Sequence, residues 1–397
     1  MAESTAMRVL FLASRHPARA TRGDQLRAYQ HIRLLSQRHQ ITLVCVDDPA
    51  LDATARREMA GYCERVVTLP PRRWQMALRA LAALPGRLPL QAAMQAAMPL
   101  AGTARRVMAD TEFDVAHVQL ARLGGVVGAL SPLPVVLDFI DALSLNMARR
   151  AQWDRSPWGW VAREESRRLA RYERELCGEV AQASVCAAQD RAAIGDFSNL
   201  HCVSNGIDLA QFPLRQTVPE SKEIVFVGNL GYFPNVDAAL WLCKEVMPQI
   251  PDGRLSLVGA RPVNALRRAA AASERVTLVG PVPAVQPYFA RARVAVAPMR
   301  AGSGQQLKVL EAMAIGTPVV ATAQTAAGLE ARDGEHLLVA DDAAAFAQAV
   351  NRLLDDAALG QRLSAAGRQL VESRYSWERS AADLEQLWIS AKAAVVP

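Results

Sequence analysis

The stretch APMRAGSGQQLKVLEAMAIGTPVVAT, residues 297–322, holds the pattern that decides the fold. It leaves an apolar strand, passes through a loop with Gly302 and Gly304, and enters a helical segment that is expected to end at Gly316. The following TPVVAT has the apolar, β-branched composition of a buried strand. A strand, a loop, a helix and a second strand in this order are typical of a parallel sheet covered by helices.

The same alternation continues through both halves of the chain. Strand-like runs in the first half lie at residues 8–12, 41–46, 114–119 and 134–140. Similar runs in the second half lie at residues 224–230, 255–260, 276–280, 294–298 and 317–322. Segments with helical spacing lie at residues 26–35, 237–247, 263–272 and 306–314. The predicted fold class is therefore α/β, with two Rossmann-like doubly wound domains.

The chain length and one turn-rich segment predict the domain boundaries. At 397 residues the chain is roughly two to three times the usual domain size. HCVSNGIDLAQFPL at residues 201–214 begins like a strand and continues with Asn, Gly, Asp and Pro, as expected of a hinge. We expect one Rossmann-like domain at 1–200, a second at 201–373, and a helix at 374–397 that returns toward the first domain. Two such domains would face each other across a cleft, where ligands bind at the carboxyl ends of the strands.

Charge is distributed unevenly between the halves. Residues 1–200 carry 26 basic and 20 acidic side chains and the rest carry 19 of each, so the net charge of +6 lies in the first half. This excess favours an anionic partner, such as a membrane surface, a phosphorylated substrate or a nucleic acid. The 51% apolar and 21% charged residues are typical of a soluble globular protein and exclude a disordered chain.

Three absences narrow the class of protein further. No apolar run approaches the roughly 20 residues of a membrane span, and Glu3 stands where a signal peptide carries positive charge, so we expect a cytoplasmic protein. The six cysteines form no C-x-x-C pair and the six histidines show no ligand spacing, so no metal site is expected. No recognisable nucleic-acid-binding motif is present, so nucleic acid is not expected as a partner.

The glycine loop and the helix after it have the chemistry of a nucleotide site. Gly302 and Gly304 permit close backbone approach, and the amides at a helix N-terminus favour an anion such as a diphosphate. Lys308 and Glu311 lie three residues apart, so they share one helix face. A cation for phosphate and a carboxylate for two hydroxyl groups fit a nucleotide diphosphate with its ribose. An ordinary solvated Lys–Glu pair would have the same spacing.

The motif GSG-x-x-x-K-V-L-E-A-M-A-x-G-x-P-V-V-A-T resembles the nucleotide-sugar signature of glycosyltransferase family 4. The similarity extends to VSNGIDLAQF at 203–212, to the strand and helix at 279–298, to GLEARDGEHLLV at 328–339 and to YSWERSAADLEQLW at 375–388. It thus covers essentially all of the expected C-terminal domain. The resemblance implies the GT-B fold, with an N-terminal domain that binds the acceptor and a C-terminal domain that binds a nucleotide diphosphate sugar.

The resemblance also implies roles for residues of the C-terminal domain. Lys308 and the backbone amides around Gly302, Ser303 and Gly304 would hold the leaving diphosphate, and Glu311 would bind the donor. The transfer would retain the anomeric configuration and need neither a metal nor a cofactor besides the donor sugar.

The first half resembles a bacterial subgroup, the sugar transferases associated with exosortase and exopolysaccharide loci. The matching segments are GDQLRAYQHIRLL at 23–35, FDVAHVQLARL at 113–123 and VLDFIDALS at 136–144. This similarity implies a role in exopolysaccharide biosynthesis, with a glycan or a lipid-linked intermediate as acceptor.

Five residues of these segments are candidates for the site. Gly23 would let the first loop bend, while Asp24 and Arg27 would fix that loop by an ion pair at the helix start or contact the donor. Asp24 could equally be a helix N-cap. By the family match His117, at a strand end, would face the donor sugar, and Asp141 would approach the reaction centre or the acceptor. A buried structural histidine is the alternative for His117.

The chain departs from the family pattern at two places. Ser303 stands where the family usually has an acid, eight residues before the helix glutamate, that holds the transferred sugar. After the strand at 224–230, many members have Arg and Lys for the diphosphate, whereas this chain has Gly228, Asn229 and Asn235 in the stretch VGNLGYFPN. We include Gly228 and Asn229 among the expected donor-binding residues, and expect Lys308 to carry more of the cationic load.

The sequence therefore predicts a metal-independent hexosyl-type glycosyltransferase. A sugar-nucleotide epimerase with the same fold is one alternative, and a catalytically silent nucleotide-binding partner protein, suggested by Ser303, is another. A dinucleotide oxidoreductase is disfavoured because no G-x-G-x-x-G follows the strand at 8–12.

Two stretches suggest peripheral contact with the anionic inner membrane. Residues 72–100 begin with Arg72, Arg73 and a Trp and continue with apolar residues, while 149–174 contain three Trp among eight Arg. Arg and Trp suit the lipid interface. Alternatively, the tryptophans fill the core and the arginines form a solvated helix face paired with four glutamates.

Overall fold

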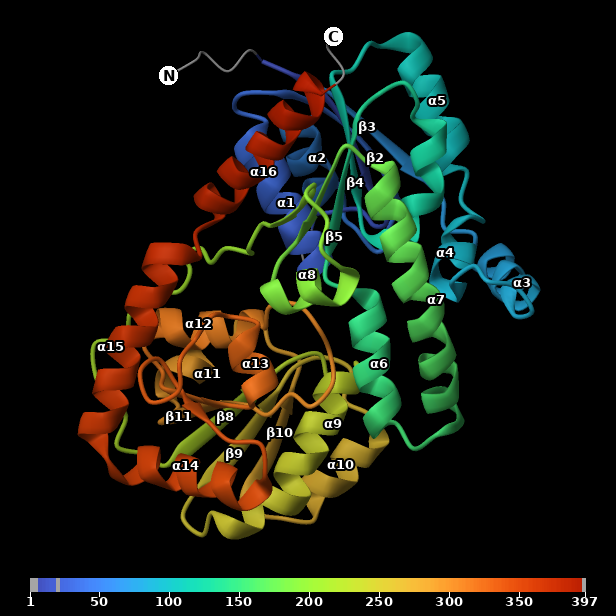
Figure 1. Ribbon diagram of the computed structural model, residues 1–397. Coiled ribbons are helices and arrows are strands. Elements are labelled where there is room, and N and C mark those ends of the chain that lie inside the picture. The colour runs from blue at the N-terminus through green and yellow to red at the C-terminus, as the bar shows by residue number, and fades with distance from the viewer. Residues whose placement is uncertain (1–5, 19–21, 395–397) are drawn as a thin grey trace. The chain divides into compact units, whose positions relative to one another are not determined.

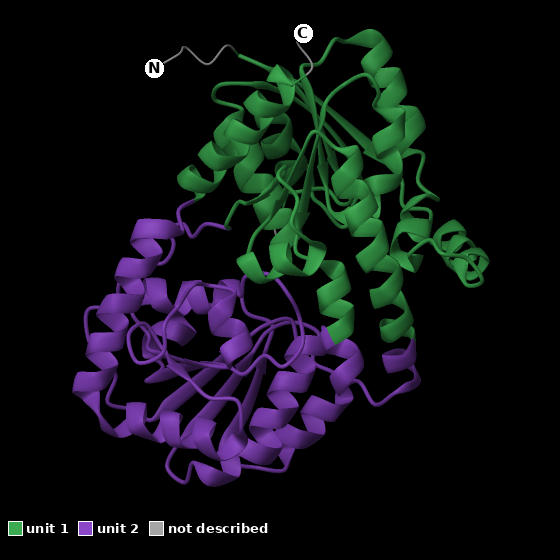
Figure 2. Cartoon of the chain, viewed as in Figure 1, with its two compact units in different colours: residues 1–148, 161–204, 377–397 green, residues 149–160, 205–376 purple. Residues whose placement is uncertain are grey.

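The computed structural model describes residues 6–18 and 22–394, and these residues form two compact units (Figure 2). Unit 1 contains residues 1–148, 161–204 and 377–397, and unit 2 contains residues 149–160 and 205–376. Each unit has one parallel sheet with helices on both faces (Figure 1), so the predicted α/β fold with two doubly wound halves is confirmed.

The sheet of unit 1 has the strand order β3-β2-β1-β4-β5-β6-β7 in the described residues. Every neighbouring pair is parallel. The runs predicted at 8–12, 41–46, 114–119 and 134–140 all become strands because they are apolar and are buried on both faces. The strands are β1 (Arg8–Ala13), β2 (Gln40–Val46), β3 (Arg65–Leu69), β4 (Val115–Gln119), β5 (Val135–Ile140), β6 (Gln182–Val185) and β7 (Leu200–Cys202).

Two apolar cores cover the two faces of this sheet. One core joins the sheet to α1, α2 and α16, and Trp388 of α16 is completely buried in it. The other core joins the sheet to α5, η1 and α7. The helices are α1 (Gly23–Leu35), α2 (Ala53–Tyr62), α3 (Arg73–Ala83), α4 (Leu90–Gln95), α5 (Leu100–Asp110), η1 (Ala121–Ala129), α6 (Leu143–Trp153), α7 (Pro157–Glu179), α8 (Ala188–Ile194) and α16 (Trp377–Ala393).

The sheet of unit 2 has the strand order β10-β9-β8-β11-β12-β13, again parallel throughout the described pairs. Its order reverses between β8 and β11, which are hydrogen-bonded neighbours although β9 and β10 come between them in the chain. The strands are β8 (Glu223–Val227), β9 (Arg254–Val258), β10 (Val276–Gly280), β11 (Val294–Ala297), β12 (Val319–Ala321) and β13 (Leu338–Val339).

The helices of unit 2 also form two layers. One face of the sheet packs against α9, η2, α10 and α14, and the other packs against α11, α12 and α15. The segment predicted as one helix at 237–247 is the end of an α-helix followed by a π-helical turn. The elements are α9 (Phe233–Trp241), η2 (Leu242–Val246), η3 (Met247–Gln249), α10 (Asn264–Ala271), α11 (Gln286–Arg291), α12 (Leu307–Ile315), α13 (Ala323–Ala327), α14 (Ala343–Asp355) and α15 (Ala357–Arg374).

One segment of the expected N-terminal domain belongs to unit 2. Residues 149–160, the end of α6 and the start of α7, have their contacts with unit 2 (Figure 2). The domain expected at 1–200 is therefore interrupted, because Arg150 and Arg149 of this segment contact Phe233 at the start of α9 and Gly302 in the glycine loop, more than 80 residues further along the chain.

Candidate functional site

The carboxyl edge of the unit 2 sheet carries the predicted glycine loop. The loop after β8 and the loop after β11 lie side by side because the two strands are neighbours. This is the place where the strand order reverses, and doubly wound sheets bind ligands outside the carboxyl ends of the strands at such a point.

Gly302 and Gly304 have backbone conformations that favour glycine. Their φ angles are +103° and +69°, a region that side chains with a Cβ rarely adopt. The loop is followed by α12, which begins at Leu307, and Gly316 caps its end in the left-handed conformation. The helix end predicted from the glycine is therefore confirmed. Ser303 is buried within the loop.

Lys308 lies in the first turn of α12 and reaches back toward β8. Its Nζ donates a hydrogen bond of 2.6 Å to Oδ1 of Asn235 and lies 4.7 Å from the ring centroid of Phe226. Nδ2 of Asn235 in turn donates to the backbone oxygen of Asn229, at 3.1 Å. The Lys308 ammonium is therefore tied to the loop after β8 by a neutral amide.

Burial shifts the pKa values of both charged residues of the motif. It lowers the pKa of the Lys308 ammonium to about 7, and the negative charge of Glu311 opposes this shift. Burial raises the pKa of the Glu311 carboxyl to about 7, and the positive charge of Lys308 opposes that shift. A bound anion beside Lys308 would restore the ammonium, so the site is suited to a ligand with negative charge.

The loop after β8 is shaped by close backbone approach. A Cβ at Gly228 would lie 2.8 Å from Cγ of Asn235, and a Cβ at Gly259 would lie 1.8 Å from the backbone oxygen of Gly228. Oδ1 of Asn229 accepts a hydrogen bond from the amide of Gly231 at 3.0 Å. Gly228 thus leaves the space that Asn235 occupies, and the Asn229 side chain forms the turn.

Residues 149–160 hold the glycine loop from one side. Nη1 of Arg149 donates to the backbone oxygen of Gly302 at 2.9 Å. The Arg300 guanidinium lies 4.3 Å from the ring centroid of Trp153 and forms a two-point ion pair with Asp237, at 2.8 and 3.1 Å. Sequence reasoning missed these residues, because Arg149 and Trp153 are separated from the loop by about 150 residues and no local pattern links them.

Arg27, expected at the donor, is completely buried in unit 1. It forms a two-point ion pair with the buried Asp138, at 2.6 and 3.2 Å, and donates to the backbone oxygen of Ser204 at 3.2 Å. Ser184 donates a further hydrogen bond to Asp138, at 2.9 Å. This placement gives Arg27 a role in stability and does not support a contact with the donor, because its guanidinium is not accessible. Sequence reasoning missed Asp138.

His117, expected to face the donor sugar, lies inside the core of unit 1. It is in the middle of β4 rather than at the strand end, and its ring centroid lies 4.3 Å from that of Phe11. Its Nδ1 accepts a hydrogen bond from Nε1 of Trp388 at 3.3 Å. Burial lowers the pKa of His117 to about 4, and the Asp138 carboxylate opposes this shift. His117 is therefore placed as a buried structural histidine, which is the alternative interpretation, and the expected contact with the sugar finds no support.

Gly23 and Asp24 begin α1 rather than precede it. Gly23 is the first residue of the helix and is exposed, while residues 19–21 of the preceding loop lie outside the described residues. The N-cap is Arg22, so the N-cap interpretation of Asp24 is wrong. Asp24 forms an ion pair with Arg15, while Arg27 pairs with Asp138. The expected ion pair at the helix start is thus present with a different partner.

Asp141 follows β5 at the carboxyl edge of the unit 1 sheet and is half-buried. Two non-glycine residues with positive φ stand at the ends of neighbouring strands, Leu120 at +75° after β4 and Ile140 at +65° in β5. Such conformations cost about 1–3 kcal/mol each and occur mainly at functional sites. The edge that carries Asp141 is therefore the candidate acceptor side of unit 1.

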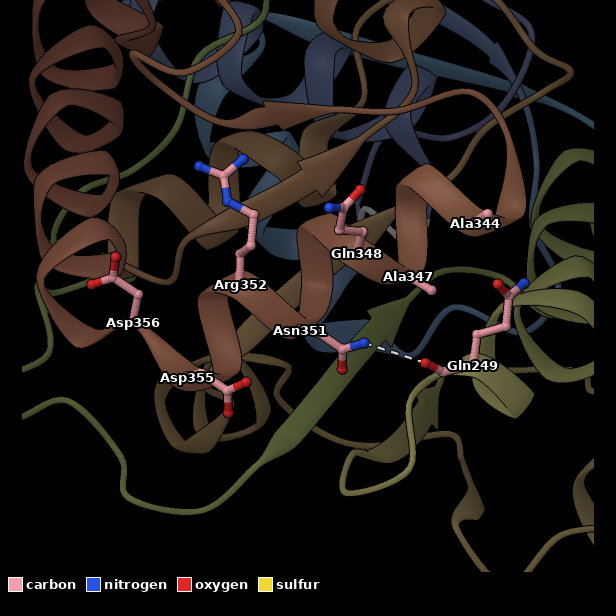
Figure 3. Close-up of a pocket in the computed structure, with 8 residues that line it drawn as sticks. All are labelled: Gln249, Ala344, Ala347, Gln348, Asn351, Arg352, Asp355 and Asp356. Carbon is pink, nitrogen blue, oxygen red and sulfur yellow. Dashed lines mark hydrogen bonds between the residues drawn. The ribbon is translucent and has the colours of Figure 1, made fainter.

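A separate pocket of about 600 Å³ lies beside α14 (Figure 3). Nδ2 of Asn351 donates to the backbone oxygen of Gln249 at 3.2 Å across this pocket. Gln249 precedes β9, Asp355 is the last residue of α14 and Asp356 follows it, so the pocket lies at the amino edge of the sheet. The glycine loop is at the opposite edge, and we do not assign the pocket to the site.

The described residues contain no group of three or more His, Cys, Asp or Glu side chains placed to hold a metal ion. Within the same residues, no helix has the length and apolar composition needed to cross a membrane.

Comparison with known proteins finds a family match over the part of the chain that contains both loops. Residues 221–356 match the family described as Glycosyl transferases group 1, and these residues include both loops. A glycogen synthase of Mycobacterium tuberculosis (strain CDC 1551 / Oshkosh) is 28% identical over 249 residues, which are 59% of this chain and 60% of the relative. A phosphatidyl-myo-inositol mannosyltransferase of Mycobacterium leprae is 28% identical over 299 residues, which are 72% of this chain and 75% of that relative. The chain thus spans about 60% of the length of the first of these relatives.

Solved structures agree with the fold over nearly the whole chain. A sucrose-phosphate synthase from Thermosynechococcus elongatus superposes with a TM-score of 0.76 at 20% identity, covering 98% of this chain and 100% of the other. Anabaena HepE in complex with UDP and glucose superposes with a TM-score of 0.69 at 14% identity, covering 97% of this chain and 100% of the other. Residues 221–356 thus match a family of glycosyl transferases, and the chain as a whole shares the GT-B fold with these solved structures.

Proposed function

We propose that the protein transfers a sugar from a nucleotide diphosphate sugar to a hydroxyl group of a glycan or lipid-linked acceptor. The observation that carries this proposal is the position of Lys308. Its ammonium is held by Asn235 between the glycine loop and the loop after β8, and its hydrogen-bond partner there is neutral. A diphosphate would supply the negative charge that the ammonium lacks.

Different residues of unit 2 would bind different parts of the donor. The backbone amides around Gly302, Ser303 and Gly304, together with Lys308, would hold the diphosphate. Glu311, on the same face of α12, would accept hydrogen bonds from the two ribose hydroxyl groups, which requires its ionised form. Gly228 and Asn229 would shape the adjoining loop and allow the nucleotide to approach the backbone.

The proposed chemistry relies on electrostatic stabilisation of the leaving group. Negative charge on the diphosphate grows as the glycosidic bond breaks, so the Lys308 ammonium and the loop amides stabilise the transition state more than the ground state. Fixed positive charge at this place can replace a metal ion, which is why we propose metal-independent transfer. Asp141 would act at the acceptor, and retention of the anomeric configuration is the stereochemistry that the resemblance to family 4 supports.

Names of similar proteins support the substrate classes. HepE was solved with UDP and glucose, which favours a nucleotide diphosphate hexose as the donor. The Mycobacterium leprae relative is named for a phosphatidyl-myo-inositol acceptor, which favours a lipid-type acceptor. With the resemblance to the exopolysaccharide subgroup, we propose a cytoplasmic enzyme of exopolysaccharide biosynthesis that works at the inner membrane.

Ser303 favours one competing function, a nucleotide-binding protein without transferase activity. The acid that usually holds the transferred sugar is replaced by a buried hydroxyl group in the loop. Such a protein would bind the nucleotide sugar through Lys308 and Glu311 but would not transfer the sugar, which would stay attached to the nucleotide.

The test combines binding and turnover. A panel of UDP-, GDP- and other nucleotide sugars is screened by thermal shift, since a ligand at 100 times its Kd adds about 2.7 kcal/mol of stability. Donors that bind are then incubated with the protein, with and without a glycan or lipid-linked acceptor, and the release of nucleotide diphosphate is measured.

We expect one donor to stabilise the protein and to release its nucleotide faster with acceptor. Binding without release would support the silent partner protein. A new sugar nucleotide formed without acceptor would indicate an epimerase, and the absence of binding by every nucleotide sugar would contradict the proposed site.

A further inference from the structure

Helix α3 of unit 1 carries a stripe of large apolar side chains on its outer face. Trp74, Leu78 and Leu81 follow one another at the spacing of a helix face and are 67%, 55% and 62% exposed. Leu84 and Leu88 continue the row past the helix end, at 52% and 42%. We call these five residues the α3 stripe.

The opposite face of α3 already packs against the unit. Met76 contacts the core that includes α5 and α7, and Ala80 and Ala83, at the same helical spacing, are half-buried. None of the residues of α3 is fully buried, so the helix has two apolar faces and only the inner one has a partner. Exposed apolar side chains that stand singly are ordinary, but a continuous row of this kind marks a surface that binds something.

The segment of the chain that carries the α3 stripe is basic. Residues 65–109 contain seven arginines and no Asp or Glu. At 3.6 residues per turn, Arg73 and Arg79 lie on opposite flanks of the stripe, and both are exposed. Arg72 precedes the helix and Arg87 follows it, and both are exposed as well. The surface therefore consists of an apolar centre with positive charge on each side.

Hydrogen bonds from α7 fix α3 in this orientation (Figure 1). Arg168 donates from Nη1 to the backbone oxygen of Ala83 at 3.0 Å and from Nη2 to that of Leu84 at 2.8 Å. Arg171 donates to the backbone oxygen of Arg87 at 2.6 Å. These bonds satisfy carbonyl groups at the helix C-terminus, where positive charge is favourable. The helix is held to the unit by its end, and its apolar row remains on the outside.

We propose that the α3 stripe is a docking surface for an anionic lipid bilayer. Trp74, Leu78 and Leu81 would enter the boundary between headgroups and acyl chains, while Arg73 and Arg79 contact the acidic headgroups. A nucleic acid would match the arginines but not the leucines. A second copy of the chain would place two basic surfaces against each other. Only a negatively charged surface with an apolar interior matches both properties.

This surface would bring unit 1 to a lipid-linked acceptor, and in that respect it rests on the proposed function. Its binding to lipid needs no nucleotide sugar and is measured separately.

The experiment is cosedimentation of the full chain with vesicles. One set contains phosphatidylcholine only, and the other contains phosphatidylcholine with phosphatidylglycerol, each at low and at high salt. We expect binding to the anionic vesicles only, weakened by salt because the headgroup attraction is screened. W74S combined with L78S, and separately R73E combined with R79E, should each weaken binding at least about tenfold, because the first removes buried apolar area and the second reverses the attraction.

Matched controls lie in unit 2. L214S removes a leucine that is 54% exposed, and R267E with R268E reverses two adjacent exposed arginines on α10. Neither should change vesicle binding. An equal loss in the controls and in the α3 variants would overturn the proposal, and so would the absence of sedimentation with anionic vesicles at low salt.

Two further measurements test whether a second copy of the chain covers the α3 stripe and whether the variants keep the donor site intact. Sedimentation velocity of the W74S/L78S variant addresses the second copy, and a change from dimer to monomer with unchanged vesicle binding would overturn the proposal. Thermal shift with the donor should be the same in wild type and in the α3 variants. A variant that loses lipid binding but still binds the donor therefore supports the role of the α3 stripe. A wild-type protein that binds no donor would contradict the proposed function and would leave the lipid-binding result unaffected.

Discussion

Arg27 in unit 1 and Lys308 in unit 2 are both cations taken largely out of water, but their partners differ. Arg27 is paired with the carboxylate of Asp138, which also accepts from Ser184, so the charge of this cluster is balanced within the protein. Lys308 donates to the neutral amide of Asn235. A buried cation with a carboxylate partner stabilises the fold, whereas one with an amide partner is left to attract an external anion.

The pKa values of Asp138 and Lys308 express the same difference. Burial acts to raise the pKa of the Asp138 carboxyl, but the charge and hydrogen bonds of the Arg27 guanidinium, with smaller contributions from His117 and His31, hold that pKa below its usual range, so the pair stays ionised. Burial lowers the pKa of Lys308 to about 7 despite the Glu311 charge nearby. The ammonium of Lys308 is thus destabilised until a ligand arrives, and this is the property that a binding site needs.

The largest expected effect is on stability. Arg27→Met leaves the Asp138 carboxylate buried without its cation, so the free energy of unfolding should fall by about 3–5 kcal/mol. Urea unfolding followed by circular dichroism measures this change. Arg56→Met, which removes a partly exposed partner of Asp47 near the surface, is the control and should have little effect. If both variants are equally stable, the Arg27–Asp138 pair does not hold unit 1 together.

Lys308→Ala should act on catalysis instead. Loss of the ammonium should lower kcat about 10²–10³-fold, because charge on the leaving diphosphate is greatest in the transition state. Donor affinity should fall less, and the free energy of unfolding should stay the same or rise, because a buried charge with a depressed pKa is removed. Steady-state kinetics and urea unfolding measure the three quantities. A loss of donor affinity with unchanged kcat would mean that Lys308 binds the ground state and the transition state equally and has no catalytic role.

Glu311→Gln should weaken donor binding. The charge-assisted hydrogen bonds from the ribose to a carboxylate contribute about 1.5–3 kcal/mol, so the Kd for the donor should rise roughly tenfold or more. Isothermal titration calorimetry with the nucleotide diphosphate gives this value directly. Glu372→Gln, at an exposed ion pair on α15, serves as the control. A Glu311→Gln variant with the affinity of wild type would remove Glu311 from the site.

The pH dependence of nucleotide binding tests whether Lys308, which donates to a neutral amide rather than to a carboxylate, gains a proton when the ligand binds. A bound diphosphate raises the pKa of Lys308 above its value of about 7 in the free protein, so the ligand binds the protonated form better. Glu311, whose carboxyl has a pKa of about 7 in the free protein, must ionise to bind the ribose, so the two groups have opposite effects on affinity near pH 7. Once Glu311 is ionised, affinity for the nucleotide diphosphate should decline as pH rises further, by up to tenfold per unit until the pKa of the complex is reached. Titration calorimetry between pH 7 and 9 measures the slope. The Lys308→Arg variant keeps its charge throughout this range and should show no decline.

The smallest expected effect concerns Arg149, which contacts the glycine loop from outside. Arg149→Met removes its hydrogen bond to the backbone oxygen of Gly302. Such a bond is worth about 1.5–3 kcal/mol when the donor is charged, and less where water can replace it, so KM for the donor should rise a few-fold with kcat nearly unchanged. Exposed Arg155, in the same segment, provides a control variant. A variant with wild-type KM would show that the loop holds its conformation without this segment.

Local features of the fold could be predicted because they depend on neighbouring residues. The apolar runs of β1, β2, β8 and β9 had the continuous composition of strands buried on both faces. Gly316 predicted the end of α12, because a left-handed C-cap favours glycine wherever the helix lies in the fold. The spacing of Lys308 and Glu311 likewise placed both side chains on one face of that helix.

Partners that are distant in the sequence could not be predicted. Arg27 meets Asp138 across 111 residues, and Lys308 meets Asn235 across 73. His117 is confined to the core because β4 extends two residues beyond it and Trp388 of the last helix packs against its ring. Whether a charged or polar side chain stabilises the core or is available to bind a ligand depends on which groups surround it. The sequence alone determined the elements, their order and the residue types at the glycine loop. The tertiary structure decided the partners, because the burial and hydrogen bonding of a side chain are set by elements that approach it only when the chain has folded.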